Sequence, residues 1–516
     1  MEHRGPDFHG IYLDGSVTRR ETIDGLKTFL KKKSRIAMGH SRLGIIGAEG
    51  LCQPYVSCDG KLTLIKNGEI YNYSALKSLL LYSHRFETNS DSEIVVHLIE
   101  ESYQGDLLEA VRRVTGILDG MYAFAVTDGK SVVLVRDPIG KKPLYYVNRD
   151  SIVYFASEKK ALWNGKDEPK RIRPGEILSI GIDGIKIRQG TRIQLPQVDI
   201  TDFRDAVERY KTVLVKAMQK RLTGLREERL GVIFSGGIDS VLIAKLLQRE
   251  GKNIVCYCTG TADSGDILAA LAVAKELGLE LKTSIIDEDL VKGILSEVIR
   301  NVEESGLLQV EVAIPMYMAA KMAAEDRIRV MFTGQAADEL FAGYPWYSDV
   351  LKESGYLRLH EQLWEDLNYL YDDTLEREDK LTMSHSIELR APYLDRDVIR
   401  TAMRISPRLK IQGSEDSLRK RVHRQAAVEL GVPPYLAFRI KDPAQSGSGI
   451  HQIIENLANT HAGDMDTELV NENIRTDKGS LYRYGEGVYG EDGARSYIQM
   501  IHQEIQNDYR KAILTA

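Results

Sequence analysis

The sequence predicts two domains: an N-terminal α+β domain with stacked antiparallel sheets, and a C-terminal doubly wound α/β domain with extra helices. The chain has 516 residues, enough for two cores. Short apolar runs separated by Gly, Asn and Asp turns fill its first third, which is typical of antiparallel sheets. Beyond residue 203 apolar strands alternate with helical patterns, which is typical of a parallel sheet. We place the boundary at residue 195, so the domains cover 1–195 and 196–516.

Composition excludes several classes of protein. The chain is 43% hydrophobic and 28% charged with a net charge of −6, so nucleic acid is not expected as a partner. No apolar run reaches the 18 or so residues of a membrane span, and the N-terminus has no secretory h-region. Four cysteines in so long a chain indicate a reducing compartment, so we expect a cytoplasmic protein.

The cysteines carry no predicted chemistry. Cys256 and Cys258 lie in a short apolar run, and one C-x-C without a second pair is a poor zinc site, so we expect buried strand cysteines. Cys52 and Cys58 have no obvious base nearby in the sequence, so neither is predicted to be a nucleophile.

Local patterns place the elements of the first domain. A helix is predicted over 90–101, with Ser90 or Asp91 as its N-cap. Strands are predicted at 62–65, 123–126, 132–135, 144–146 and 152–155.

The stretch from Leu230 to Leu247 predicts a phosphate-binding turn. A buried strand is followed by Ser235, Gly236 and Gly237, and Asp239 and Ser240 then open an apolar-periodic helix. Glycines let backbone N–H groups approach an anion, and the helix dipole favours its charge. An aspartate in such a turn repels phosphate unless a cation bridges them, which indicates Mg²⁺ bound together with a nucleotide.

The rest of the second domain continues this alternation. After a linker at 191–201 we expect a helix over 203–221, a strand at 254–258 ending at Thr259, a helix over 267–277 and a strand at 282–286. A second strand and small-residue turn, V-M-F-T-G-Q-A-A-D-E, follows at 330–339. The charged stretch 376–395 is predicted to be helical, with Arg377 and Asp379 in structural pairs.

Taken in order, these strings resemble the asparagine synthetase family. The N-terminal strings are H-R-G-P-D at 3–7, G-H-S-R-L at 39–43, Q-P at 53–54, N-G-E-I-Y-N at 67–72, S-D at 90–91 and R-D-P-I-G-K-K-P-L-Y at 136–145. The C-terminal strings are S-G-G-I-D-S at 235–240, T-G-Q-A-A-D-E at 333–339, E-L-R-A-P-Y-L-D at 388–395 and R-I-K at 439–441. The resemblance implies an Ntn-hydrolase-like glutamine amidotransferase domain and a PP-loop ATP pyrophosphatase-like domain.

The resemblance also implies a reaction. ATP and aspartate would form β-aspartyl-AMP and pyrophosphate, and ammonia from glutamine or from solution would then displace AMP to give asparagine. The chain would thus be an AMP-forming carbon–nitrogen ligase of amino-acid biosynthesis that uses ATP and Mg²⁺. Its partners would be the small molecules aspartate, ATP and glutamine or ammonia, and the resemblance leaves open whether two copies of the chain form a homodimer.

By position, the residues implied to hold glutamine are Arg42, Asn67, Gly68, Glu69 and Asp91. A guanidinium can form two parallel hydrogen bonds with the carboxylate of an amino acid, and a side-chain carboxylate can form an ion pair with its ammonium. The family begins M-C-G-I, and its cysteine is the glutaminase nucleophile, but this chain has Glu2 after Met1. Either the recorded start lies downstream of the true one, which we favour, or free ammonia is used. Without the first strand of the family, an unpaired sheet edge is expected.

The resemblance places the synthetase chemistry in the second domain. The metal ligands implied are Asp239 and Asp338. ATP and pyrophosphate would contact Ile233, Ser235, Gly236, Gly237, Asp239, Ser240, Thr259, Thr333 and Gly334. Lys441 would stabilise the leaving pyrophosphate, with Lys420 and Arg424 helping. Gln335 stands where many members carry glutamate, and because an amide is no base, its role would be hydrogen bonding.

Two alternatives remain open at this point. A related adenylating enzyme closes a β-lactam ring and can also lack the N-terminal cysteine, although it has no reason to keep the glutamine-site residues. A non-catalytic protein that retains the fold is the other, and the presence of Asp239, Asp338 and Lys441 argues against it.

Overall fold

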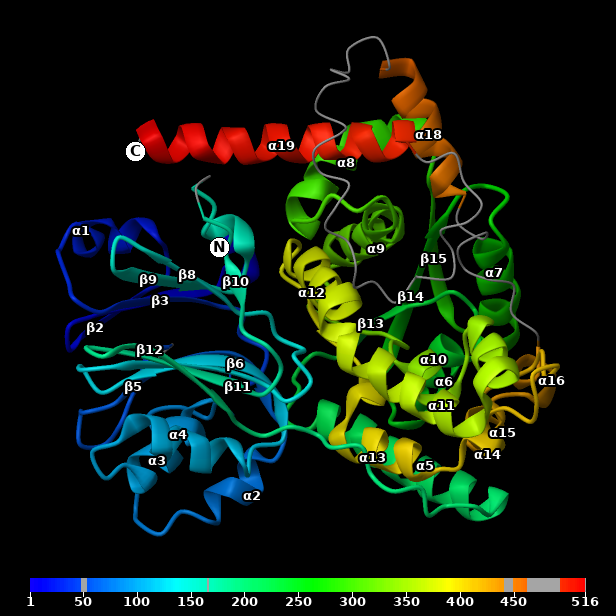
Figure 1. Cartoon of the computed structure of the whole chain (residues 1–516), viewed down its shortest axis with the longest axis horizontal. Coiled ribbons are helices and arrows are strands. Elements are labelled where there is room, and N and C mark those ends of the chain that lie inside the picture. Colours follow the sequence, from blue (N-terminus) through cyan, green and yellow to red (C-terminus); the bar gives the residue numbers. More distant parts are fainter. Residues whose placement is uncertain (48–52, 165–166, 440–448, 462–491, 516) are drawn as a thin grey trace. The chain divides into compact units, whose positions relative to one another are not determined.

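The structure, a computed structural model, describes residues 1–47, 53–164, 167–439, 449–461 and 492–515. It divides into two compact units (Figure 1). Unit 1 comprises Met1–Ile193, Lys220–Glu227 and Met383–Ser386, and unit 2 comprises Gln194–Gln219, Glu228–Thr382 and Ile387–Ala516. The single boundary at residue 195 stays a prediction.

Unit 1 contains three antiparallel sheets. The largest has six strands in the order β12-β11-β7-β6-β5-β4, and two three-stranded sheets have the orders β2-β1-β3 and β10-β8-β9. All strands predicted in this region are present. Their bounds are β1 (Phe8–Leu13), β2 (Ser16–Arg20), β3 (Ala37–Arg42), β4 (Tyr55–Val56), β5 (Thr63–Ile70), β6 (Gly120–Thr127), β7 (Val132–Arg136), β8 (Tyr145–Arg149), β9 (Ile152–Ala156), β10 (Lys170–Arg171), β11 (Glu176–Gly181) and β12 (Gly184–Gln189).

The central strands of the six-stranded sheet are buried on both faces. Along β6, Phe124 and Val126 join a core with the helices α3 (Glu93–Ser102) and α4 (Leu107–Thr115), whereas Ala123 and Ala125 join a second core with residues of the three-stranded sheets. The period of two along a strand produces this division. Figure 1 shows the resulting layers, helices beneath one face and further strands above the other. The stacked-sheet prediction is confirmed.

The predicted N-cap of α3 is wrong. The cap position is Ser92, and its side chain makes no capping hydrogen bond. The Asp91 carboxylate instead accepts from the backbone N–H of Ile70 on β5 at 2.6 Å and from Lys66 Nζ at 3.3 Å. The Oδ2 atom of Asp91 is therefore bonded to donors on β5 and does not cap the first turn of α3.

Unit 2 is built on a five-stranded sheet in the order β15-β14-β13-β16-β17, in which every neighbouring pair is parallel. The chain starts at the central β13, moves outward to one side and then outward to the other, so the direction reverses between β13 and β16. Ligands bind at such switch points, beyond the carboxyl ends of the strands. The strands are β13 (Arg229–Ile233), β14 (Asn253–Gly260), β15 (Glu280–Ile285), β16 (Val330–Phe332) and β17 (Glu388–Arg390). The doubly wound prediction is confirmed.

Helices surround this sheet, and α9 covers part of one face. Val255 and Tyr257 of β14 pack against Ala319, Ala320 and Ala323 of α9. Among the described helices, none is long and apolar enough to cross a membrane. The helices of unit 2 and those that pass into unit 1 are α5 (Phe203–Leu222), α6 (Ile238–Arg249), α7 (Gly265–Leu277), α8 (Glu288–Val302), α9 (Leu307–Glu325), α10 (Ala337–Phe341), α11 (Trp346–Leu370), α12 (Glu376–Met383), α13 (Arg396–Arg404), α14 (Pro407–Lys410), α15 (Arg421–Glu429), α16 (Pro434–Ala437), α18 (Ile450–His461) and α19 (Asp492–Thr515).

Cys256 and Cys258 are buried in β14, as predicted. Burial raises the pKa of each thiol to about 12, so both stay neutral. A neutral buried thiol behaves as a small apolar side chain and is unreactive.

The helical prediction for 376–395 is only partly right. Residues 376–383 form α12, but Glu388–Arg390 form the edge strand β17, parallel to β16. Two backbone bonds hold this strand in place, from the N–H of Glu388 to Arg329 O at 2.9 Å and from the N–H of Thr333 to Arg390 O at 3.0 Å. Pairing with a distant strand overrides a local pattern that carries little β signal.

Candidate active site

The predicted phosphate turn joins β13 to α6. Gly236 has φ +68°, and a Cβ at that position would lie 2.8 Å from the backbone carbon of Ala269, so both backbone conformation and space require glycine. The helix begins at Ile238, one residue before the predicted opening, with Gly237 as its N-cap. Because glycine offers no capping side chain, the first N–H groups of α6 face the turn without a side-chain acceptor.

A second turn, from β16 to α10, lies directly against the first. A Cβ on Gly334 would lie 2.9 Å from Asp239 Cβ, so glycine lets the two turns touch. Thr333 is buried at the end of β16, and Ala336 has φ +81°. Gln335, between them, is half-buried. The structure thus brings the two predicted metal ligands, Asp239 and Asp338, to the switch point.

Lys420 joins the two aspartates. Its Nζ lies 2.7 Å from Asp239 Oδ2 and 2.7 Å from Asp338 Oδ1, and its side chain is buried. Burial alone lowers the pKa of Lys420, but the charges of Asp239 and then Asp338 outweigh it and raise that pKa. The side chain therefore stays an ammonium between two carboxylates. Gly343 is needed beside it, because a Cβ there would overlap both Asp338 and Lys420.

Three further side chains around Asp239 were missed by the sequence analysis. His423 Nε2 lies 3.1 Å from Asp239 Oδ1, and His423 Nδ1 lies 2.8 Å from the hydroxyl of Tyr210. Tyr393 donates its hydroxyl proton to the backbone O of Asp239 at 2.9 Å. Burial lowers the pKa of His423 in spite of Asp239, which favours a neutral imidazole. The spacing of Lys420 and His423, three residues apart at the start of α15, is the signal that could have found the histidine.

Arg424 lies close to this group but its contacts are with backbone. Its Nε donates to Arg419 O at 3.0 Å, and its Nη1 donates to Ala437 O at 2.6 Å and to Arg439 O at 2.9 Å. Arg439 in turn donates to Gly236 O at 3.0 Å. These bonds fasten residues 437–439 to the phosphate turn. Lys441, predicted to be catalytic, lies outside the described residues.

The remaining predicted ATP contacts line the ends of the strands. Thr259, at the end of β14, donates to Pro315 O at 2.7 Å, and Ser240 donates to Gly237 O at 3.1 Å. Ser235 Oγ accepts from the N–H of Gly237 at 3.4 Å, and Ile233 packs against the sheet core. The hydroxyls of Ser235 and Ser240 therefore shape the turn, whereas Thr259 ties β14 to α9.

Unit 1 holds the predicted glutamine residues. Arg42 ends β3, and its Nη2 donates to Ile46 O at 3.1 Å and to Gly47 O at 2.6 Å. β5 carries Asn67, Gly68 and Glu69. Gly68 has φ +107°, and a Cβ at this position would overlap the backbone O of Met121, so glycine is required. Lys66 Nζ links this strand to Asp91 by bonding Gly68 O at 2.6 Å and lying 3.3 Å from Asp91 Oδ2.

Two buried donors in this group have no hydrogen-bond partner among the described residues. They are Arg42 Nη1 and Asn67 Nδ2. The charges of Arg42 and Asp91 both act on the buried hydroxyl of Tyr55, so the cation and the anion lie in one neighbourhood. Unsatisfied buried donors are costly and mark sites that a ligand completes. A guanidinium and a carboxylate together suit the two charges of an amino acid.

A unit of stacked antiparallel sheets, together with a phosphate-turn unit that carries paired aspartates, is typical of an ATP-dependent enzyme of nitrogen transfer. Residues 1–180 match the glutamine amidotransferase domain family, and residues 209–358 and 351–483 match the asparagine synthase family. A Methanocaldococcus jannaschii protein, provisionally named asparagine synthetase [glutamine-hydrolyzing] 1, is 34% identical over 507 residues, which cover 89% of this chain and 91% of that protein. Asparagine synthetase [glutamine-hydrolyzing] 3 of Arabidopsis thaliana is 29% identical over 495 residues, covering 91% of this chain and 78% of the relative.

The chain belongs to the asparagine synthetase family, which consists of ATP-dependent carbon–nitrogen ligases. The comparisons do not favour the β-lactam-forming alternative.

Proposed function

We propose that the chain makes asparagine from aspartate and ATP at the switch point of unit 2. An oxygen of aspartate's β-carboxylate attacks the α-phosphorus, the α–β bridging bond breaks, and pyrophosphate leaves. Ammonia then bonds to the acyl carbon and releases one proton to solvent, and AMP leaves with the bridging oxygen. The observation that carries this proposal is the group of Asp239, Asp338 and Lys420 at two touching turns, with a phosphate-type helix N-terminus beside it.

Two residues of this group fit Mg²⁺. Asp239 and Asp338 already share one cation, the Lys420 ammonium, so their oxygens point to a common place. Carboxylates and phosphate oxygens are the ligands that Mg²⁺ takes in nucleotide sites. When bound, Mg²⁺ would neutralise phosphate charge. Lys420 would stay near the leaving pyrophosphate, and the amides of α6 would hold the phosphates.

The chain's other residues position these groups. His423 lies against the Asp239 carboxylate and is itself held by Tyr210, while Tyr393 fixes the backbone of Asp239. Arg424 and Arg439 keep the segment 437–439 on the phosphate turn. Positioning of this kind supplies much of the rate enhancement in ligases of phosphate-activated acids.

The test is to supply the purified chain with ATP, Mg²⁺, aspartate and ammonium and to measure AMP and asparagine. We expect equal amounts of both products, and none when aspartate is omitted or replaced by glutamate. Ammonium as the nitrogen source isolates the synthetase unit from the glutamine site. AMP without asparagine from folded protein would contradict the assignment of aspartate. Repeating the assay with glutamine shows whether this 516-residue chain also releases ammonia.

For unit 1 we propose that Arg42 and Asn67 bind the α-carboxylate of glutamine, and that Glu69 and Asp91 lie at its α-ammonium. The buried Nη1 of Arg42 and Nδ2 of Asn67, which have no hydrogen-bond partner among the described residues, support this placement. Arg42→Lys keeps the charge but removes the fork, so the Kd for glutamine should rise about 10- to 100-fold. Calorimetric titration of glutamine measures it. Arg112→Lys, an exposed helix position in unit 1, is the matched control and should bind like wild type.

A further inference from the structure

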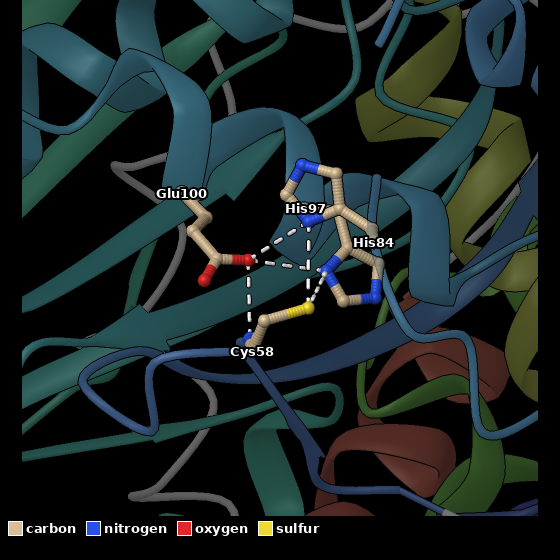
Figure 2. A group of neighbouring side chains, drawn as sticks. All are labelled: Cys58, His84, His97 and Glu100. Carbon is tan, nitrogen blue, oxygen red and sulfur yellow. Dashed lines mark hydrogen bonds and ion pairs between the residues drawn. The ribbon is translucent and has the colours of Figure 1, made fainter. Parts of the chain in front are cut away.

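Four side chains with metal-binding atoms converge in unit 1 (Figure 2). They are Cys58, His84, His97 and Glu100, and one ligand atom of each lies within 4.8 Å of all the others. Cys58 Sγ is 3.5 Å from His84 Nδ1 and 3.7 Å from His97 Nδ1. Glu100 Oε2 is 3.2 Å from each of the same two nitrogens.

Three separate segments deliver these residues. Cys58 lies in the turn between β4 and β5, and His84 lies between α2 (Tyr73–Lys77) and α3. His97 and Glu100 are three residues apart on α3, which puts them on one face of the helix. The side chains of His97, His84 and Glu100 are 1%, 5% and 14% exposed, whereas Cys58 is exposed. The group is thus nearly closed, with the thiol at its open side.

Four of the six distances between the ligand atoms match a tetrahedral zinc site. With Zn–S near 2.3 Å and Zn–N and Zn–O near 2.0–2.1 Å, tetrahedral angles place S and N about 3.6 Å apart and N and O about 3.3 Å apart. The observed separations of 3.5 and 3.7 Å, and of 3.2 Å twice, agree with both values. The other two pairs of ligand atoms lie within 4.8 Å of one another.

The outward nitrogens of both histidines face carboxylates. His84 Nε2 lies 3.1 Å from Glu101 Oε1, and His97 Nε2 lies 3.7 Å from Glu93 Oε1. At hydrogen-bond distance, the Glu101 carboxylate favours a proton on His84 Nε2, which leaves the lone pair of His84 Nδ1 facing the centre. The longer contact with Glu93 orients the ring of His97. This arrangement recurs around zinc in proteins because it orients the imidazole and strengthens it as a ligand.

Backbone N–H groups hold the other two ligands. Glu100 accepts from the N–H of Cys58 at 3.1 Å and from that of Asp59 at 2.9 Å, and Cys58 Sγ accepts from the N–H of Arg85 at 3.4 Å. These hydrogen bonds fix the positions of the sulfur and the carboxylate. One sulfur, two imidazole nitrogens and one carboxylate oxygen form a ligand set that suits Zn²⁺.

We propose that Cys58, His84, His97 and Glu100 bind one Zn²⁺ ion. All four positions are protein ligands, as in sites that stabilise structure. The ion would tie the segment around His84 to α3 and to the β4–β5 turn, and α3 starts next to Asp91 of the predicted glutamine group. The sequence analysis found no base near Cys58 because both histidines are more than 25 residues away in the chain. This proposal is independent of the function proposed above.

The test measures metal on the full chain. Protein freed of metal with a chelator is incubated with zinc sulfate, separated by gel filtration and analysed by mass spectrometry of its metal content. We expect one zinc per chain. Replacement by Co²⁺ should give the absorption of a tetrahedral site together with a thiolate-to-cobalt band, which reports Cys58 in the unaltered protein.

Variants then identify the ligands. Cys58→Ser should abolish the thiolate band. Cys58→Ser and Glu100→Gln should each weaken zinc binding by about 100-fold or more. Loss of a residue that only hydrogen-bonds to a ligand typically costs about 10- to 100-fold, which is less. Glu109→Gln on α4 and His451→Asn on α18 are controls that should retain the metal. Absence of stoichiometric zinc would overturn the proposal and leave the two histidines as partners of their neighbouring glutamates. A cobalt spectrum without the thiolate band would also overturn it, because Cys58 would then not be a ligand.

Discussion

Replacing Asp239 with asparagine should lower kcat/KM for ammonium-dependent asparagine formation by about 100- to 1000-fold. The change removes one of the two carboxylates that share the Lys420 ammonium, and with it half of the charge proposed to hold Mg²⁺ at the phosphate turn. An amide of the same shape keeps the contacts with neighbours but not the charge. The loss should therefore appear in the chemistry rather than in folding.

Two measurements separate these causes. Aspartate-dependent exchange of pyrophosphate into ATP reports formation of the acyl-adenylate alone, and it should fall as much as overall turnover. Circular dichroism and thermal unfolding should resemble wild type. Asp199→Asn is the matched control, because Asp199 pairs with Arg404 at an exposed position in unit 2, and it should retain wild-type activity. Near-normal exchange by Asp239→Asn would contradict the proposed metal role.

Replacing Lys410 with methionine should stabilise the protein at neutral and acidic pH. Lys410 ends α14 and is completely buried, and its Nζ has no hydrogen-bond partner among the described residues. Burial lowers the pKa of Lys410 from 10.5 to about 7. A shift of this size corresponds to a cost on the order of 5 kcal/mol for the charged form in the folded state. Methionine fills similar volume without a charge.

The pH dependence follows from the sign of the shift. The unfolded chain binds the Lys410 proton up to about pH 10.5, and the folded chain releases it near pH 7, so wild-type stability rises with pH between these values. The advantage of Lys410→Met should be largest at and below pH 7 and should shrink by about 1.4 kcal/mol per pH unit above it. Urea unfolding at pH 6 and pH 9 measures this. Lys352→Met, at an exposed position on α11, is the control, and a pH-independent difference between wild type and Lys410→Met would contradict the assignment.

Contiguous patterns were enough to predict the fold class of both units. Short apolar runs between Gly, Asn and Asp turns located the strands of unit 1, and the strand, glycine turn and helix of 230–247 located the switch point of unit 2. Both depend on backbone geometry over a few neighbouring residues, which is why a sequence expresses them directly. The failures were at Glu388–Arg390 and at the cap of α3, where partners distant in the chain supply the hydrogen bonds.

The sequence by itself therefore determined the phosphate turn, the strand and helix order and the candidate carboxylates Asp239 and Asp338. Only the tertiary structure decided that Lys420 lies between them, that His423 and Tyr393 hold Asp239, and that Cys58 meets two histidines. The physical reason is the distance along the chain over which the interactions act. A turn or a helix is selected by the conformational preferences of adjacent residues, whereas a buried charge or a metal ligand set is selected by partners that come together only when the chain has folded.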